Sequence, residues 1–194
     1  MKRPLSLLML STSLLLTVPF STTQGLAAPE AAQAAPDASK EKLFAANRAK
    51  AKIAWDKDMK TFAKDFTELE KEYQEINAKF KSPEIKDLLT KFIEKWKTGN
   101  RVGCATLYLA QKSGGESREK LLKQCVGEFS DAWYLDGTQV GGLGRLYLAS
   151  FYKQSGKLEE VKKLVTEIHK DFATSQDHSR NLIIDMMKEL EPTD

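Results

Sequence analysis

The chain has 194 residues, and its 30 Lys and Arg residues against 27 Asp and Glu residues give a net charge of +3 at pH 7. Residues 1–27 carry two of the cations and no acid, so the chain after them has a net charge of only +1, which excludes nucleic-acid binding through overall charge. With 41% hydrophobic residues, the chain is long enough to bury the core of one domain.

The first 39 residues predict export. Two cations precede an apolar run at residues 5–20, and small residues around Ala27 follow it, which are the three parts of a secretory signal peptide. Ser, Thr and Pro residues interrupt the run, so it suits a cleaved signal peptide (1–27) better than a membrane anchor. Residues 28–39 are rich in Ala and Pro, and we expect them to form a disordered tether. The protein is therefore expected to be bacterial and either periplasmic or secreted.

Residues 40–81 contain no Pro or Gly and predict one long helix. Its second part carries large apolar residues spaced alternately by four and three, as in a heptad seam: Trp55, Met59, Phe62, Phe66, Leu69, Tyr73, Ile76 and Phe80. Bulky aromatic residues suit a wide helical core better than a two-stranded coiled coil, so we expect the seam to pack on the rest of a monomer rather than form a coiled-coil dimer. The basic start of the helix, before Trp55, should project as an arm that touches anionic lipid weakly, an acidic protein or nothing.

Residues 82–191 predict a region of helical hairpins. Ser82-Pro83-Glu84 gives the start signal of one amphipathic helix, and two similar segments follow at residues 102–129 and 140–172. In each segment a Leu-Tyr-Leu-Ala run leads through a Ser-Gly turn into another helix; the leading runs are 39 residues apart and the trailing apolar residues 43. A last helix ends at Pro192. We therefore expect an all-α fold in which the long N-terminal helix packs on a short array of αα-hairpins.

The segment at residues 140–172 resembles a known family. Residues 152–161, with the sequence Tyr-Lys-Gln-Ser-Gly-Lys-Leu-Glu-Glu-Val, resemble the turn and second helix of a tetratricopeptide repeat, and residues 104–129 resemble a degraded copy. The copies stand about 40 residues apart instead of the family's 34, and Val161 occupies a position where the family usually has alanine. The resemblance implies a scaffold for protein interactions, and no binding residues can be transferred with it.

A binding groove is expected along the first helices of the hairpins, around Tyr108 and Tyr147. The connection at residues 130–142 is longer than is usual between hairpins and contains Trp133 and Tyr134. Two interpretations of this loop stay open, because its aromatic side chains could cover an edge of the core or present anchors to a protein or peptide partner. All four aromatic residues are candidate partner-binding residues.

Cys104 and Cys125 are the two cysteines of the chain, and we predict a disulfide bond between them. They lie at about equal distances from the predicted turn of the first hairpin, and antiparallel packing would bring the two helix ends together. In an exported protein, two cysteines favour a disulfide over a metal site or a redox motif.

The sequence shows no motif for catalysis, cofactor binding or metal binding. His169 and His178 are the only histidines, and no further ligand spacing marks them; the glycine cluster at residues 141–144 lacks the sequence context of a phosphate loop. These observations favour a non-catalytic adaptor or scaffold for another envelope protein or peptide. Two alternatives are a periplasmic holdase chaperone, for which the sequence predicts no strand-rich base, and an enzyme with a site in the helical groove.

Overall fold

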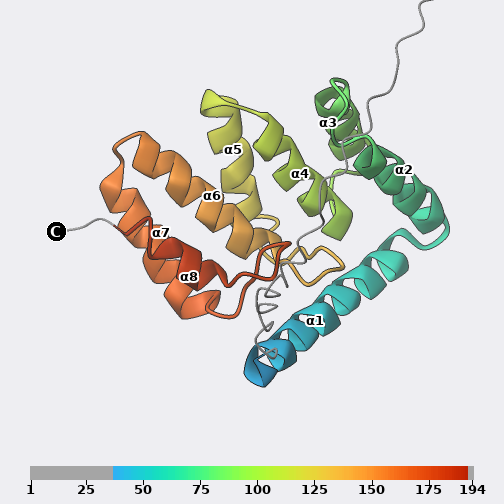
Figure 1. Ribbon diagram of the computed structural model, residues 1–194. Coiled ribbons are helices and arrows are strands. Elements are labelled where there is room, and N and C mark those ends of the chain that lie inside the picture. The colour runs from blue at the N-terminus through green and yellow to red at the C-terminus, as the bar shows by residue number, and fades with distance from the viewer. Residues whose placement is uncertain (1–36, 192–194) are drawn as a thin grey trace, which may run out of the picture. The chain divides into compact units, whose positions relative to one another are not determined.

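The computed structural model describes residues 37–191, and within them the fold is all-α, as predicted, with no strand. The elements, coloured along the chain in Figure 1, are α1 (Ala38–Phe62), a 3-10 turn (Ala63–Asp65), α2 (Phe66–Ala78), α3 (Ile85–Trp96), α4 (Asn100–Lys112), α5 (Gly115–Val126), α6 (Val140–Gln154), α7 (Leu158–Asp171) and α8 (Ile183–Met187). The predicted signal peptide and residues 28–36 of the predicted tether lie outside the described residues. The last two residues of the predicted tether, Ala38 and Ser39, already belong to α1. None of the described helices combines the length and the apolar character that crossing a membrane requires.

The helices from α2 to α8 form an array of hairpins (Figure 1). The first helices α2, α4, α6 and α8 contact one another in succession, and the second helices α3, α5 and α7 lie in the angles between them. The two predicted hairpins are present as α4/α5 and α6/α7. A third hairpin, α2/α3, precedes them, because the second half of the predicted long helix pairs with the helix that follows it.

The predicted single helix at residues 40–81 is wrong in one respect, because the chain turns a corner at Ala63–Asp65. Ala63 has φ +46°, which is uncommon for a residue other than glycine. On the inside of the corner the Phe62 ring packs edge-on against Trp96, with 5.7 Å between centroids, and lies so close to Gly99 that a Cβ there would be 2.8 Å from the ring. A straight helix could not hold α1 and α2 against their different neighbours at once.

Beyond the corner, the heptad seam packs within the chain as predicted. Leu69, Tyr73 and Ile76 are buried in the core that α2 shares with the hairpins, and Phe66 is buried edge-on against Trp55 of α1, with 5.0 Å between centroids, whereas Met59 is 41% exposed. The Arg101 guanidinium of α4 pairs with Glu70 of α2, with an Nη2–Oε2 distance of 2.9 Å, and lies over the Tyr73 ring. Apolar packing and one buried ion pair thus join α2 to α4.

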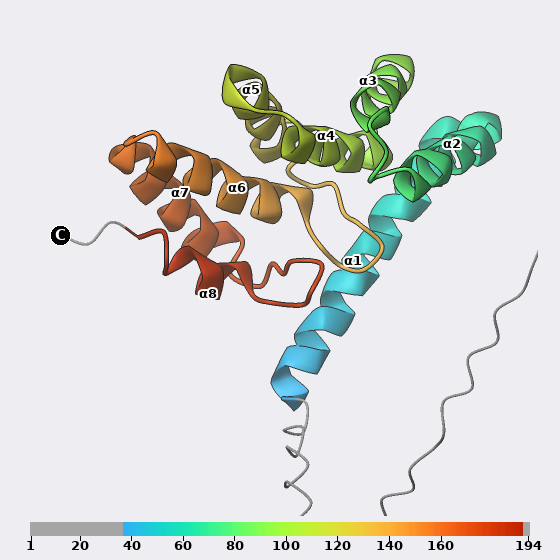
Figure 2. The ribbon, with the colours of Figure 1, turned by 45° about the horizontal axis from the view of Figure 1, so that its top comes forward.

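Helix α1 lies across one edge of the array and does not project from it (Figures 1 and 2). The N-terminal half of α1 was expected to project as a free arm. This prediction is wrong, because the inward face of that half buries Phe44, Asn47 and Ala51. The Asn47 amide donates hydrogen bonds to the Thr174 carbonyl at 2.8 Å and to Gln176 Oε1 at 3.3 Å, both in the loop between α7 and α8. Polar side chains were not part of the apolar pattern, which explains why the sequence did not reveal this contact.

Near its other end, α1 provides the N-terminal cap of α4. The buried Asp58 carboxylate accepts hydrogen bonds from the backbone N–H of Asn100 at 2.9 Å and of Arg101 at 3.1 Å. The Asn100 side chain in turn bonds both backbone polar groups of Trp133, accepting from its N–H at 2.5 Å and donating to its carbonyl at 2.8 Å. One carboxylate on α1 therefore fixes the start of α4, and α4 fixes the loop between α5 and α6.

Replacing Asp58 should weaken the whole edge of the array. Asp58→Ala leaves two buried N–H groups without an acceptor, and we expect a loss of about 1–3 kcal/mol in the free energy of unfolding, measured by urea denaturation. Asp56→Ala on the same helix is the control; it removes only a surface pair with Lys52 and should cost less than about 0.5 kcal/mol. Equal effects of the two substitutions would contradict the capping role of Asp58.

Candidate functional site

The loops after α5 and α7 have the same structure. Each is closed by an isolated antiparallel bridge, Trp133 with Gln139 in the first and Gln176 with Leu182 in the second. The bond that ends each loop also recurs, from Val140 N–H to the Ala132 carbonyl at 2.8 Å and from Ile183 N–H to the Ser175 carbonyl at 2.9 Å. Corresponding residues are 43 apart, so the offset of the trailing apolar residues in the sequence continues through the loops.

Each loop lies directly on the first helix of the preceding hairpin because that helix has a glycine at the contact. A Cβ on Gly103 of α4 would be 2.6 Å from the Ala132 Cβ, and a Cβ on Gly142 of α6 would be 2.7 Å from the Ser175 Cβ. These glycines are 39 residues apart, the spacing of the leading runs. Two members of the glycine cluster at residues 141–144 therefore serve loop packing, because Gly141 lies similarly close to Ser130 of the first loop.

A small surface of aromatic and charged side chains lies where the two loops meet the first helices. His178 of the second loop has its Nδ1 2.7 Å from Asp136 Oδ2 of the first loop, and its ring centroid is 6.4 Å from that of Tyr108 on α4. Tyr147 of α6 is close enough to Asp177 for the carboxylate to raise the pKa of the phenol, in addition to the larger effect of burial. We name this surface the tyrosine face: Tyr108, Asp136, Tyr147, Asp177 and His178.

Tyr134 supports the tyrosine face from beneath. Its ring centroid is 5.1 Å from that of Tyr108 and 4.6 Å, edge-on, from that of His178, and its hydroxyl donates to the Cys104 carbonyl at 2.9 Å. Aromatic pairs in such tilted and edge-to-face arrangements are attractive beyond the area that they bury. Tyr134 thereby joins both loops to α4.

The ionisation states of the tyrosine face follow from burial and from its hydrogen bonds. Burial raises the pKa of Tyr108 to about 12 and that of Tyr134 well above its ordinary value, so both phenols are neutral at pH 7. Burial also acts to raise the pKa of Asp136, but hydrogen bonds from His178 and from the Thr138 N–H outweigh it and lower the pKa overall. The face therefore presents neutral phenols and an ionised Asp136, and it offers no phenolate as a nucleophile.

The four predicted partner-binding residues fall into two groups. Tyr108 and Tyr147 are half-buried at matching positions of adjacent helices, beside the same loop. Trp133 and Tyr134 are only 7% and 5% exposed, so the core-edge interpretation of their loop is right and the anchor interpretation is wrong for these two residues. Asp136, Asp177 and His178 were not predicted as partner-binding residues; extending the 43-residue offset past residue 172 would have aligned the two loops and indicated their common structure.

The predicted Cys104–Cys125 disulfide is absent, because both cysteines are free and no pair lies at disulfide distance. Both side chains are buried, but they face different neighbours. Cys104 lies near Tyr73 of α2, whereas the Cβ of Cys125 is 3.0 Å from where a Cβ on Gly144 of α6 would be. Burial raises the pKa of the Cys104 thiol to about 12 and raises that of Cys125 as well, so both thiols are protonated at neutral pH.

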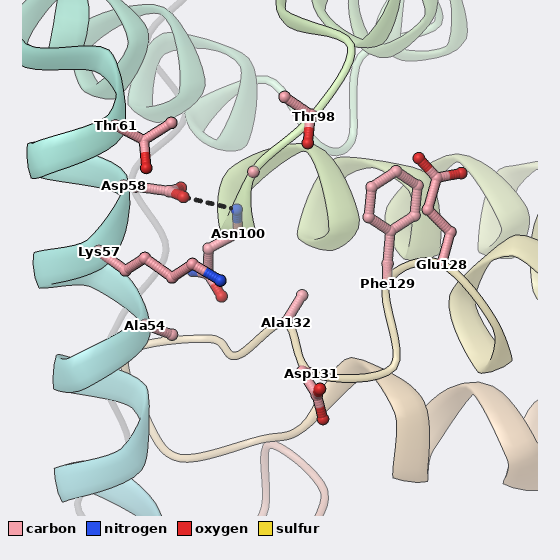
Figure 3. A pocket seen from close by; sticks show the side chains of 11 residues that line it. Ala54, Lys57, Asp58, Thr61, Thr98, Asn100, Glu128, Phe129, Asp131 and Ala132 are labelled. Carbon is pink, nitrogen blue, oxygen red and sulfur yellow. Dashed lines mark hydrogen bonds between the residues drawn. The ribbon is translucent and has the colours of Figure 1, made fainter.

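A pocket of about 220 Å³ opens between α1 and the start of α4 (Figure 3). Lys57 reaches into it from α1, and Glu128 and Asp131 lie on its opposite side. Its buried charged residue is Asp58, whose pKa is raised by burial against the lowering effect of the Asn100 and Arg101 N–H groups. Because both Asp58 oxygens already accept hydrogen bonds from α4, this carboxylate is structural and is not free to act as a base.

Among residues 37–191, no group of three or more His, Cys, Asp or Glu side chains is arranged to hold a metal ion. Comparisons with known proteins add no assignment: a scan against protein-family models found no match, and searches of curated proteins and of solved structures found none either. The interpretation of function therefore depends on the geometry of this chain alone.

Tyr134 provides a direct test of the corrected role of the loop. Tyr134→Ala removes a buried ring from three aromatic and polar contacts and should lower the free energy of unfolding by about 3–5 kcal/mol, whereas Tyr134→Phe removes one hydrogen bond and should cost about 0.5–1.5 kcal/mol. The measurement is chemical denaturation of each variant. A Tyr134→Ala protein as stable as the parent would show that this side chain is a free anchor after all.

The Asp136–His178 contact should make stability depend on pH in one direction. Because the pKa of Asp136 is lower in the folded chain than in the unfolded chain, its contribution is present above the unfolded value near 4 and is lost as pH falls through the folded value. The destabilisation caused by Asp136→Asn should therefore be larger at pH 6 than at pH 3 in denaturation experiments. A destabilisation that stayed constant or grew toward pH 3 would show that the pKa of Asp136 is not lowered.

Proposed function

We propose that this protein is an exported, non-catalytic adaptor that binds another envelope protein or a peptide at the tyrosine face. The observation that carries the proposal is the placement of Tyr108 and Tyr147, which are half-buried at matching positions of α4 and α6 and lie beside the same loop, near His178 and Asp177 respectively. Tyrosine combines a large apolar ring with a hydroxyl that forms hydrogen bonds, and it is enriched where proteins meet. Export is inferred from the signal-like residues 1–27.

The architecture supports binding for a second reason. Successive hairpins present their first helices on a continuous surface, which is how helical arrays usually bind extended segments. The resemblance of residues 152–161 to a tetratricopeptide repeat agrees with this use of the fold.

The absence of catalysis is supported by how the titratable groups of the tyrosine face are used. Asp136 pairs with His178, and Asp177 accepts hydrogen bonds from the backbone N–H groups of Ser179 and Asn181 within its own loop. Tyr108, with its pKa raised to about 12, is a poor nucleophile at neutral pH. These groups shape and stiffen a binding surface.

A photo-crosslinking amino acid placed at Tyr147 tests the proposal in the native envelope. We expect one predominant protein adduct, whose yield falls at least fivefold when Tyr108→Ala is introduced in the same chain. The control carries the crosslinker at Lys163, an exposed position of α7, and should give no such adduct.

Two results would contradict this assignment. Many unrelated adducts at Tyr147 would favour the holdase alternative, and the same adduct at Tyr147 and Lys163 would mean that the tyrosine face is not the binding surface. The melting temperature of Tyr108→Ala must be measured alongside, so that a loss of fold is not mistaken for a loss of binding.

A further inference from the structure

The positive charge of the described residues is concentrated on one helix. Residues 38–65 contain eight Lys and Arg residues against four acids, whereas residues 66–191 contain twenty of each. One of the four acids, Asp58, is buried against α4 and does not reach the surface. The exposed surface of α1 is therefore strongly basic beside an array with no net charge.

Two lysines and an isoleucine lie on the face of α1 that points away from the array. Its inward face is the one that carries Phe44, Asn47, Ala51 and Asp58. About half a helical turn away from these, at helical spacing, lies an outward stripe whose members are all exposed: Lys42, Ala49, Ile53 and Lys60. Neither Lys42 nor Lys60 forms an ion pair with any residue of the described range.

At the centre of the stripe is Ile53, which is 69% exposed and is the most exposed of the large hydrophobic side chains described. Both views of the ribbon show α1 at the edge of the array, with no other helix on its outward side (Figures 1 and 2). The stripe is thus an apolar side chain between cations, on a helix about 37 Å long that is held in place by its opposite face.

We propose that the outward face of α1 is a docking surface for a membrane that contains anionic lipids. Lys42 and Lys60 meet the phosphate groups of the lipid heads, and Ile53 enters the boundary between heads and acyl chains. This surface shares no residue with the tyrosine face, so it would hold the protein at the membrane while the proposed partner binds elsewhere.

The composition of the face favours lipid over an acidic protein. A stable protein interface buries about 800 Å² on each partner around a packed apolar centre, and a stripe with one alanine and one isoleucine between lysines cannot provide that centre. A flat anionic surface needs only exposed cations in one plane, and it places no demand for shape complementarity on α1.

Flotation of the full-length protein with lipid vesicles tests the proposal. We expect binding to vesicles of phosphatidylcholine with about 30% phosphatidylglycerol at low salt, and at least tenfold weaker binding to pure phosphatidylcholine or in about 0.5 M NaCl, because salt screens exposed charges. Lys42→Glu/Lys60→Glu should weaken binding to the anionic vesicles at least tenfold. Ile53→Ser should weaken it about threefold.

The matched control is Lys86→Glu/Lys163→Glu, which changes the net charge equally at exposed positions of α3 and α7. All variants share residues 1–37, so differences between them report on the helices. If the control double variant weakened binding as much as the α1 double variant, the proposal would be overturned, since net charge alone would then explain the loss. Absence of binding to the anionic vesicles would also overturn it, and capture of an acidic protein by α1 without such binding would assign the face to a protein partner.

Discussion

The capping of α4 by Asp58 is the interaction on which the arrangement of the described residues depends. The first N–H groups of a helix have no partner within the helix, and at α4 they are buried, so an acceptor must come from elsewhere in the chain. Asp58 supplies it, and the Asn100 side chain extends the connection to the backbone of Trp133. At the other end of α1, Asn47 makes the equivalent connection to the loop after α7. Polar contacts at two points thus hold a helix that contributes few apolar side chains to the core.

These contacts also shape the surface that a partner can reach. The two loops cover part of the surface of the first helices. The Tyr134 ring packs against Tyr108, and the Gln176 amide donates a hydrogen bond to the Asp136 carbonyl at 3.2 Å. What stays accessible is the half-buried side of Tyr108 and Tyr147. The proposed binding surface is accordingly smaller than an open groove, and its geometry depends on α1 through the loops that α1 holds.

Sequence periodicity was sufficient for those parts of the fold that apolar packing determines. The spacing of Leu and Tyr residues predicted the two hairpins, and the seam from Phe66 to Ile76 predicted the docking of α2. The corner at Ala63 had no sequence signal, since no Gly or Pro marks it and the positive φ is imposed by contacts on both sides. The polar contacts of Asn47 and Asp58 were equally invisible, because each joins residues more than forty positions apart. The disulfide prediction failed because equal distance from a turn places two residues at the same height but does not specify which way their side chains point.

Hydrogen–deuterium exchange of the backbone amides of α1 tests the central claim most directly, which is that this helix is docked along its length by polar contacts to α4 and to the loop after α7. An isolated helix of this composition would open frequently and exchange quickly, whereas a docked helix opens only when the edge of the array opens. We expect the backbone amides of residues 47–58 of α1 to exchange about as slowly as those in the middle of α4 and α6. Exchange of these amides at the rate of a free helix, with α4 and α6 still protected, would contradict the docking of α1.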